Sequence, residues 1–172
     1  AIDENFKNKV FDHIIFADIL EHVADPWGVL KHYYRYLKPD GRLIVSLPNT
    51  AAWTKRFRFL FGSFDYEDTG IMDRDHIRFF TMKSAKEMIK DAGFTIIKID
   101  YIPYFIRIFQ PAIKKIFLKN MTIDSTNRNI LSDSPFYGFY MKFVYPVEYW
   151  LGYPFKSFFA FKMVLIAKKL HV

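Results

Sequence analysis

Residues 11–49 read FDHIIFADILEHVADPWGVLKHYYRYLKPDGRLIVSLPN, and their pattern predicts the fold class of the chain. Residues 11–17 and 42–47 are short apolar runs rich in β-branched and aromatic residues, which is typical of buried strands. Between them, apolar residues recur at helical spacing from Trp27 onward. Strand, helix and strand with short connections form a βαβ unit, which predicts parallel strands joined by a right-handed crossover.

The expected helix of this unit carries a signal at each end. Asp25 is suited to cap its N-terminus, and Pro26 to occupy its first position, where a missing N–H costs nothing. Residues 38–41 (KPDG) predict its end, because proline and glycine both oppose a continued helix.

The alternation of strand and helix continues downstream. Thr81 predicts the cap of a second amphipathic helix that stops at Gly93, and residues 95–102 and 162–168 predict two more strands. The sequence therefore predicts an α/β sheet with helices on its faces. Residues 103–161 contain five prolines, so we expect an insertion or lid subdomain there, within a single domain over 1–172.

Composition narrows the class of protein. The chain has 172 residues, 51% of them hydrophobic and 25% charged, which is typical of one globular domain. It has no cysteine, which excludes a disulfide scaffold and a thiolate metal site. The sequence shows no signal peptide and no run of about 20 apolar residues, so a cytoplasmic location is expected.

The positive charge is concentrated in the last third of the chain. Residues 1–100 hold 15 Lys and Arg and 15 Asp and Glu, whereas residues 101–172 hold 10 and 3. That basic third is also rich in aromatic residues, among them Tyr104, Tyr149 and Trp150. Such a segment fits a substrate lid, a packed core, or a surface that contacts an anionic membrane.

Residues 53–64 (WTKRFRFLFGSF) interleave cations with aromatic side chains. This pattern occurs where single-stranded nucleic acid is bound, and also in amphipathic helices whose Arg and Lys stems cover apolar surface. Since the sequence has no recognised nucleic-acid-binding signature, nucleic acid is not expected as a partner.

An ordered series of short motifs resembles the central and C-terminal part of class I S-adenosylmethionine-dependent methyltransferases, especially the branch of the ubiquinone-biosynthesis O-methyltransferases. The motifs are Phe11-Asp12, Leu20-Glu21-His22, Asp25-Pro26, the LKPDG of residues 37–41, Pro48-Asn49, the HIRFFT of residues 76–81, and Ala92-Gly93-Phe94. Residues 162–169 resemble the last strand of that family, so the resemblance covers residues 8–102 and 160–170.

The resemblance implies a Rossmann-like sheet of seven strands with the last one antiparallel. Only the family's fourth to seventh strands are expected here, because the sequence has no glycine-rich turn before residue 11. The chain is therefore expected to be a partial methyltransferase domain that lacks most of the cofactor contacts. Residues 11–17 would then form an open apolar edge, covered either by upstream residues or by a second copy in a homo-oligomer.

The resemblance also implies site residues. Ala17, Asp18 and Ile19 are expected to line the methionine part of S-adenosylmethionine, although Asp18 also fits a plain turn aspartate. His22 is the candidate general base, since a neutral imidazole suits removal of a hydroxyl proton. A role for His22 in packing beside the next helix is the alternative. A metal site containing Glu21 and His22 is disfavoured because adjacent side chains on a turn diverge, so no metal is expected.

Three further residues are expected on the substrate side of the sheet: Asn49, His76 and Arg78. The planar guanidinium of Arg78 suits an anionic substrate. The alternative for His76 and Arg78 is a solvated loop over residues 73–78 with internal ion pairs.

Two functions remain open from sequence. The first is an enzyme that moves a methyl group from S-adenosylmethionine to a hydroxyl or amine of a small-molecule or lipid-linked substrate. The second is a non-catalytic scaffold of methyltransferase-like fold that binds a membrane surface or a partner protein.

Overall fold

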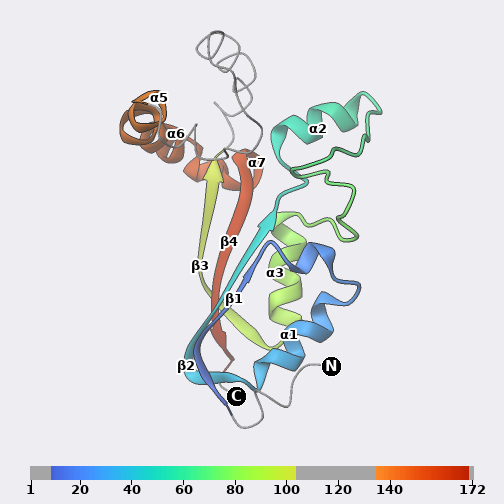
Figure 1. Ribbon diagram of the computed structural model, residues 1–172, viewed down its shortest axis with the longest axis vertical. Helices are drawn as coiled ribbons and strands as arrows, with labels where there is room; N and C mark the ends of the chain where they lie inside the picture. The colour runs from blue at the N-terminus through green and yellow to red at the C-terminus, as the bar shows by residue number, and fades with distance from the viewer. Residues whose placement is uncertain (1–8, 104–134, 171–172) are drawn as a thin grey trace.

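A computed structural model describes residues 9–103 and 135–170, and a four-stranded sheet forms its centre (Figure 1). The strands are β1 (Phe11–Ala17), β2 (Leu37–Pro48), β3 (Phe94–Pro103) and β4 (Ala160–Lys169). Their order across the sheet is β1-β2-β4-β3. The predicted α/β class is confirmed, whereas the correspondence of these strands to the family's fourth to seventh stays a prediction.

The sheet is mixed. β1 and β2 are parallel, with Ile14 opposite Leu43 and Phe16 opposite Val45, as expected for the βαβ unit. β4 is the last strand in the chain, but it lies between β2 and β3 and runs antiparallel to both. Consequently the carboxyl ends of β1 and β2 and the amino end of β4 lie at the same end of the sheet.

Two capped helices cover one side of this sheet, α1 (Pro26–Tyr34) and α3 (Met82–Asp91), and they contact each other (Figure 1). The Asp25 carboxylate accepts a hydrogen bond of 2.9 Å from the N–H of Gly28, which confirms the predicted cap of α1. Thr81 forms a capping box with Ser84 at the start of α3. Both caps satisfy N–H groups that have no partner within the helix.

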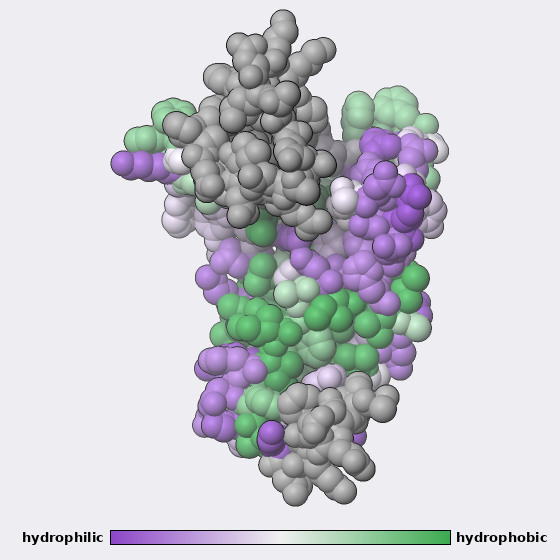
Figure 2. All heavy atoms as spheres, viewed as in Figure 1, coloured by the Kyte–Doolittle hydropathy of each residue, from purple (hydrophilic) through white to green (hydrophobic). Residues whose placement is uncertain are grey.

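The core lies between these two helices and the sheet. Alternate residues of β2 point into it, and Leu43, Val45 and Leu47 are at most 1% exposed. Leu30 of α1 and Met88 of α3 pack into the same cluster. Each fully buried side chain of this kind stabilises the fold by about 1.5–3 kcal/mol relative to exposure. On the face shown in Figure 2, an apolar band runs across the middle between hydrophilic regions.

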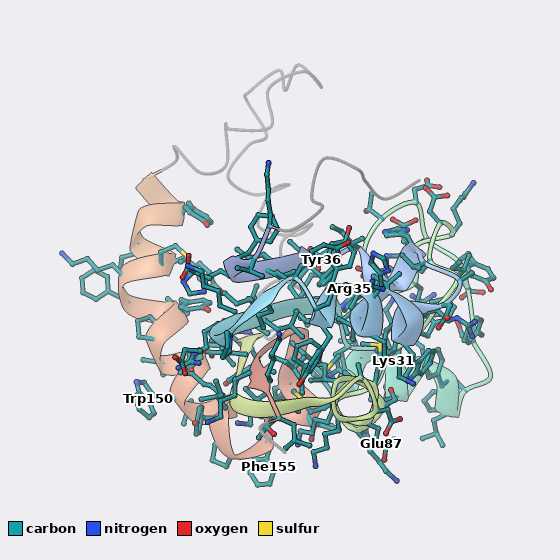
Figure 3. All side chains as sticks on the ribbon, turned by 90° about the horizontal axis from the view of Figure 1, so that it is seen from below. Lys31, Arg35, Tyr36, Glu87, Trp150 and Phe155 are labelled. Atoms are coloured by element: carbon teal, nitrogen blue, oxygen red, sulfur yellow. The ribbon has the colours of Figure 1, made fainter. Side chains whose placement is uncertain are left out.

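A second group of helices lies near the carboxyl end of β3. These are α5 (Pro135–Phe139), the π-helix η4 (Tyr140–Val144), α6 (Tyr145–Gly152), η5 (Tyr153–Phe155) and α7 (Lys156–Phe159). α5 and α6 lie away from α1 and α3, on the other side of the sheet (Figures 1 and 3). Residues 104–134 of the predicted insertion, with Tyr104, lie outside the described residues, so the insertion remains a prediction.

The structure corrects one boundary. The first helix ends at Tyr34, and β2 begins at Leu37, before the KPDG motif rather than after it. Leu37 is 1% exposed and pairs with Phe11 of β1, and the register between the two strands shifts before His13. Burial of the Leu37 side chain therefore outweighs the helical spacing that predicted a longer helix.

None of the helices in the described parts of the chain combines the length and the apolar character needed to cross a bilayer.

Candidate functional site

A cavity of about 380 Å³ lies where β1 and β2 end and β4 begins. In open sheets of parallel strands, ligands bind at the carboxyl ends of the strands. The cavity is lined by Asp18, Glu21, His22, Pro48, Thr69, Gly70, Asp73, His76, Phe161 and Lys162. Three of these residues, Asp18, His22 and His76, are candidate site residues from the sequence.

Asp18 follows β1 directly and has a left-handed backbone, with φ of 52°. Its carboxylate accepts a hydrogen bond of 2.6 Å from the Ser46 hydroxyl and forms an ion pair with Lys162. Burial opposes the charge, but the bonds from Lys162 and Ser46 prevail and lower the pKa of Asp18. Ala17 and Ile19, on either side of Asp18, are exposed.

Glu21 and His22 belong to a single 3₁₀ turn, η2 (Leu20–His22), that follows Asp18. Glu21 is 1% exposed, and its Oε2 has no hydrogen-bond partner among the described residues. Burial raises the pKa of the Glu21 carboxyl, and the nearby charge of Asp18 adds to the rise. His22 is exposed, so the turn presents one buried carboxyl and one accessible imidazole to the same cavity.

His76 lies directly beside this turn. Its ring centroid is 4.7 Å from that of His22, with the rings edge to face, and its Nε2 is 4.0 Å from Glu21 Oε1. The backbone N–H groups of Ile77 and Arg78 donate to the Glu21 carbonyl at 3.0 and 2.9 Å. These bonds fix the segment around His76 against the turn, although the two are more than fifty residues apart in the sequence.

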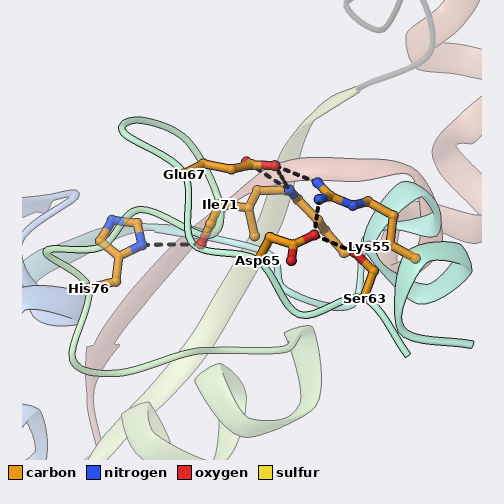
Figure 4. A network of polar contacts seen from close by, with 7 residues as sticks. Lys55, Ser63, Asp65, Glu67, Ile71 and His76 are labelled. Atoms are coloured by element: carbon orange, nitrogen blue, oxygen red, sulfur yellow. Dashed lines mark hydrogen bonds and ion pairs between the residues drawn. The ribbon is translucent and has the colours of Figure 1, made fainter. Parts of the chain in front are cut away.

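Figure 4 shows how the segment that carries His76 is attached to α2 (Trp53–Leu60). Lys55 is buried, and its Nζ donates to both oxygens of Glu67 at 2.7 and 2.8 Å. Arg58 binds Glu67 at 2.6 Å and Asp65 at 2.7 Å. A buried cation with a bidentate partner is costly to separate, so this cluster holds the segment in place.

The other two predicted substrate residues have structural contacts. Asn49 is fully buried, and its amide N–H₂ donates to the carbonyls of Ser157 and Ala160, each at 3.0 Å. Its Oδ1 accepts from the N–H of Ala51 at 3.1 Å, so the side chain ties the end of β2 to the start of β4. Asn49 is not among the residues that line the cavity.

Arg78 is directed toward the start of α1 rather than toward the cavity. Its guanidinium donates to the Ala24 carbonyl and lies 5.9 Å from the Trp27 ring centroid. Arg78 thus braces the segment before α1. Arg74 pairs at 2.5 Å with Asp68, which lies outside residues 73–78, so the predicted ion pairs within that loop stay a prediction.

Among the charged residues of the cavity, Asp73 and Lys162 were not considered as site residues from the sequence. For Lys162 the sequence holds one signal, because this lysine interrupts an otherwise apolar run over residues 158–167. A lysine in a mid-sheet strand needs a polar partner, and Asp18 supplies it from 144 positions away. For Asp73 we find no local signal.

Comparisons with known proteins agree with this architecture. A family model described as methyltransferase domain matches residues 1–99. The demethylmenaquinone methyltransferase of Listeria welshimeri is 31% identical over 111 residues, which cover 57% of this chain and 47% of that protein. The same enzyme of Listeria monocytogenes is 30% identical with the same coverage. The chain thus spans about half the length of the curated relatives it matches.

One solved structure has a fold similar to that of this chain. A putative methyltransferase from Bacillus halodurans is 18% identical, with a TM-score of 0.50 over 98% of this chain and 68% of that chain. At this identity the likeness supports the fold alone, and the family follows from the match over residues 1–99. The chain therefore belongs to the methyltransferase-domain family, as its resemblance to class I S-adenosylmethionine-dependent methyltransferases predicted.

Proposed function

We propose that the protein transfers a methyl group from S-adenosylmethionine to a hydroxyl or amine of a small-molecule or lipid-linked acceptor. The observation that carries this proposal is the cavity at the carboxyl ends of β1 and β2, in a chain of the methyltransferase-domain family. The relatives named demethylmenaquinone methyltransferases support a quinone-type acceptor.

Ala17, Asp18 and Ile19 are the residues that we propose to contact the cofactor. They fit this role because the left-handed turn at Asp18 leaves both neighbours exposed beside the cavity. Ile19, which is 46% exposed, offers apolar surface, while the Asp18 carboxylate is already neutralised by Lys162. When bound, the cofactor supplies an electrophilic methyl group on a sulfonium.

His22 is the residue that we propose to act on the acceptor. Its Nδ1 is bonded to the Asp75 carbonyl at 3.0 Å, so Nε2 is the nitrogen left to accept a proton on a side chain that lines the cavity. An accessible imidazole nitrogen there can accept the hydroxyl proton as the new O–C bond forms. Glu21 and His76, which line the same cavity, are buried.

Calorimetric titration of S-adenosylhomocysteine into the full-length protein tests the cofactor assignment. We expect saturable binding at one site, weakened at least about tenfold, or 1.4 kcal/mol, by Ile19→Asp. The matched control is Ile97→Asp, because Ile97 lies on β3 and is 47% exposed. A folded protein that gives no binding heat, or an equal loss in both variants, would refute the assignment.

A second function, contact with a membrane surface, is supported by the exposed apolar side chains of α6 and its neighbours. Val147, Trp150, Leu151 and Phe155 are 56–72% exposed, and Trp150 and Phe155 point away from the body of the protein (Figure 3). Lysines such as Lys142 add positive charge to these helices. This contact suits a lipid-linked acceptor, and it is also what a scaffold without catalytic activity would retain.

A further inference from the structure

The strongest unexplained feature of the cavity is the grouping of Glu21, His22 and His76. One donor atom from each of the three residues lies within 4.8 Å of the donor atoms of the other two. Two of the three side chains are buried and the third is exposed, so the group is open on one side only.

Hydrogen bonds define which nitrogen of each imidazole is free. Nδ1 of His22 bonds to the Asp75 carbonyl at 3.0 Å, and Nδ1 of His76 bonds to the Ile71 carbonyl at 3.2 Å (Figure 4 shows the latter). A carbonyl oxygen can only accept, so each Nδ1 carries a proton. In the neutral imidazole the lone pair is then on Nε2. The same arrangement orients histidines that bind metal ions.

The carboxyl of Glu21 does not satisfy these lone pairs. Its Oε1 is 4.0 Å from His76 Nε2, which is beyond hydrogen-bond distance. Its Oε2 has no partner among the described residues, although the side chain is 99% buried. The three residues therefore offer electron-pair donors within 4.8 Å of one another, and none of the described residues donates a proton to Glu21 Oε2. Buried polar groups are normally paired, and a bound cation would supply the missing partner.

The surroundings are held by backbone hydrogen bonds and include acidic side chains beside the Asp18–Lys162 ion pair. The N–H groups of Ile77 and Arg78 hold His76 against the Glu21 carbonyl, and Asp73 lines the same cavity. Ligands bound to one zinc ion at about 2.1 Å are roughly 3–3.5 Å apart, so the group would need to contract by about 1 Å. His22 is exposed, so its side chain can rotate toward Glu21 and His76, whose Oε1 and Nε2 atoms are already 4.0 Å apart.

We propose that Glu21, His22 and His76 bind one divalent transition-metal cation, with its remaining positions open to the cavity. Two imidazole nitrogens and one carboxylate suit Zn²⁺, Mn²⁺ or Fe²⁺, whereas Mg²⁺ prefers oxygen ligands alone. The expectation from sequence that adjacent residues on the turn would diverge overlooked His76. This residue comes from another segment and supplies a donor that converges with both.

The cation site goes beyond the proposed methyl transfer and changes the role of His22. With a cation present, the Nε2 lone pair of His22 is used for coordination. An acceptor hydroxyl that binds at an open position would lose its proton more easily because of the cation's charge. The accessible imidazole serves as the proton acceptor only in the metal-free protein.

The test is calorimetric titration of Zn²⁺ and, separately, Mg²⁺ into the EDTA-treated full-length protein. We expect one equivalent of Zn²⁺ to bind and to raise the melting temperature, and Mg²⁺ to give no comparable binding. Glu21→Gln and His22→Ala should each weaken Zn²⁺ binding at least about 100-fold, since loss of an outer partner alone costs 10–100-fold. His13→Ala is the matched control, because His13 is an exposed histidine of β1 and should have no effect.

Melting curves of the metal-free variants show whether each remains folded, and the exposed position of His22 makes its variant the safer of the two. Absence of saturable Zn²⁺ binding, or unchanged binding in folded His22→Ala, would overturn the proposal. The two proposals fail separately: both variants should still bind S-adenosylhomocysteine, whereas Ile19→Asp should weaken that binding and leave Zn²⁺ binding unchanged.

Discussion

Asn49 connects two strands through a single side chain. It was expected to contact substrate, but two of its three hydrogen bonds join the end of β2 to Ser157 and Ala160, where β4 begins, and the third is a local bond from Ala51. We expect Asn49→Ala to lower the free energy of unfolding by about 2–3 kcal/mol, because buried carbonyl and N–H groups lose their partners. Urea denaturation measures this change. Unchanged stability together with a raised KM for the acceptor would return Asn49 to the substrate site.

The sequence predicted the site only where a local motif carries it. Asp18, Glu21 and His22 lie within five residues of one another, directly after a predicted strand. Their common location at the end of that strand therefore follows from the sequence alone. His76 was expected near the substrate, but its distance of 4.0 Å from Glu21 depends on bonds between distant segments. Asn49 and Arg78 were also expected near the substrate. Both instead donate hydrogen bonds to carbonyls of distant segments, which no local sequence pattern indicates.

At the scale of elements, caps were better predictors than spacing. Asp25 and Thr81 marked the starts of α1 and α3 correctly, since a side-chain cap is a local interaction. The end of α1 was predicted three residues too late, because Leu37 gains more from burial beside β1 than from another helical turn. Tertiary packing therefore set the boundary that helical periodicity could not.

The ion pairs of Glu67 connect α2 to the segment that carries His76, and their contribution to stability should depend on pH. Burial opposes the charge of Glu67, but its bonds with Lys55 and Arg58 prevail and lower its pKa. The stabilisation is therefore present above the unfolded carboxyl pKa and is lost as the pH falls through the lower folded value. We expect Glu67→Gln to lower the free energy of unfolding by about 1–2 kcal/mol near neutral pH, since Lys55 stays buried.

Thermal melts of both proteins between neutral and acidic pH would measure this difference, which should shrink as Glu67 of the wild type becomes protonated. Asp68→Asn is the matched control, because the Asp68–Arg74 pair is largely exposed and should contribute little. A difference between wild type and Glu67→Gln that does not change with pH would contradict the role of the ion pairs.

At the scale of the whole molecule, the exposed helices near α6 test the membrane hypothesis. We expect the protein to co-sediment with vesicles that contain anionic lipid, and less so as salt is added. Replacing both Trp150 and Leu151 with serine should weaken this binding at least about tenfold, because both side chains supply apolar area to the interface. Ile15→Ser is the control, since Ile15 is 59% exposed on β1 at the opposite edge of the sheet. Equal binding by both variants would contradict the hypothesis.

The position of β4 has a consequence for how the protein is made. β4 follows β1, β2 and β3 in the sequence, but it lies between β2 and β3 and contributes Lys162 to the cavity, so β2 and β3 are joined in one sheet only when β4 is in place. A chain still emerging from the ribosome therefore exposes the edges of both strands until residues 160–169 have also emerged. Folding of the sheet and assembly of the cavity must then occur together, once β4 is available, and exposure to aggregation is greatest just before that step.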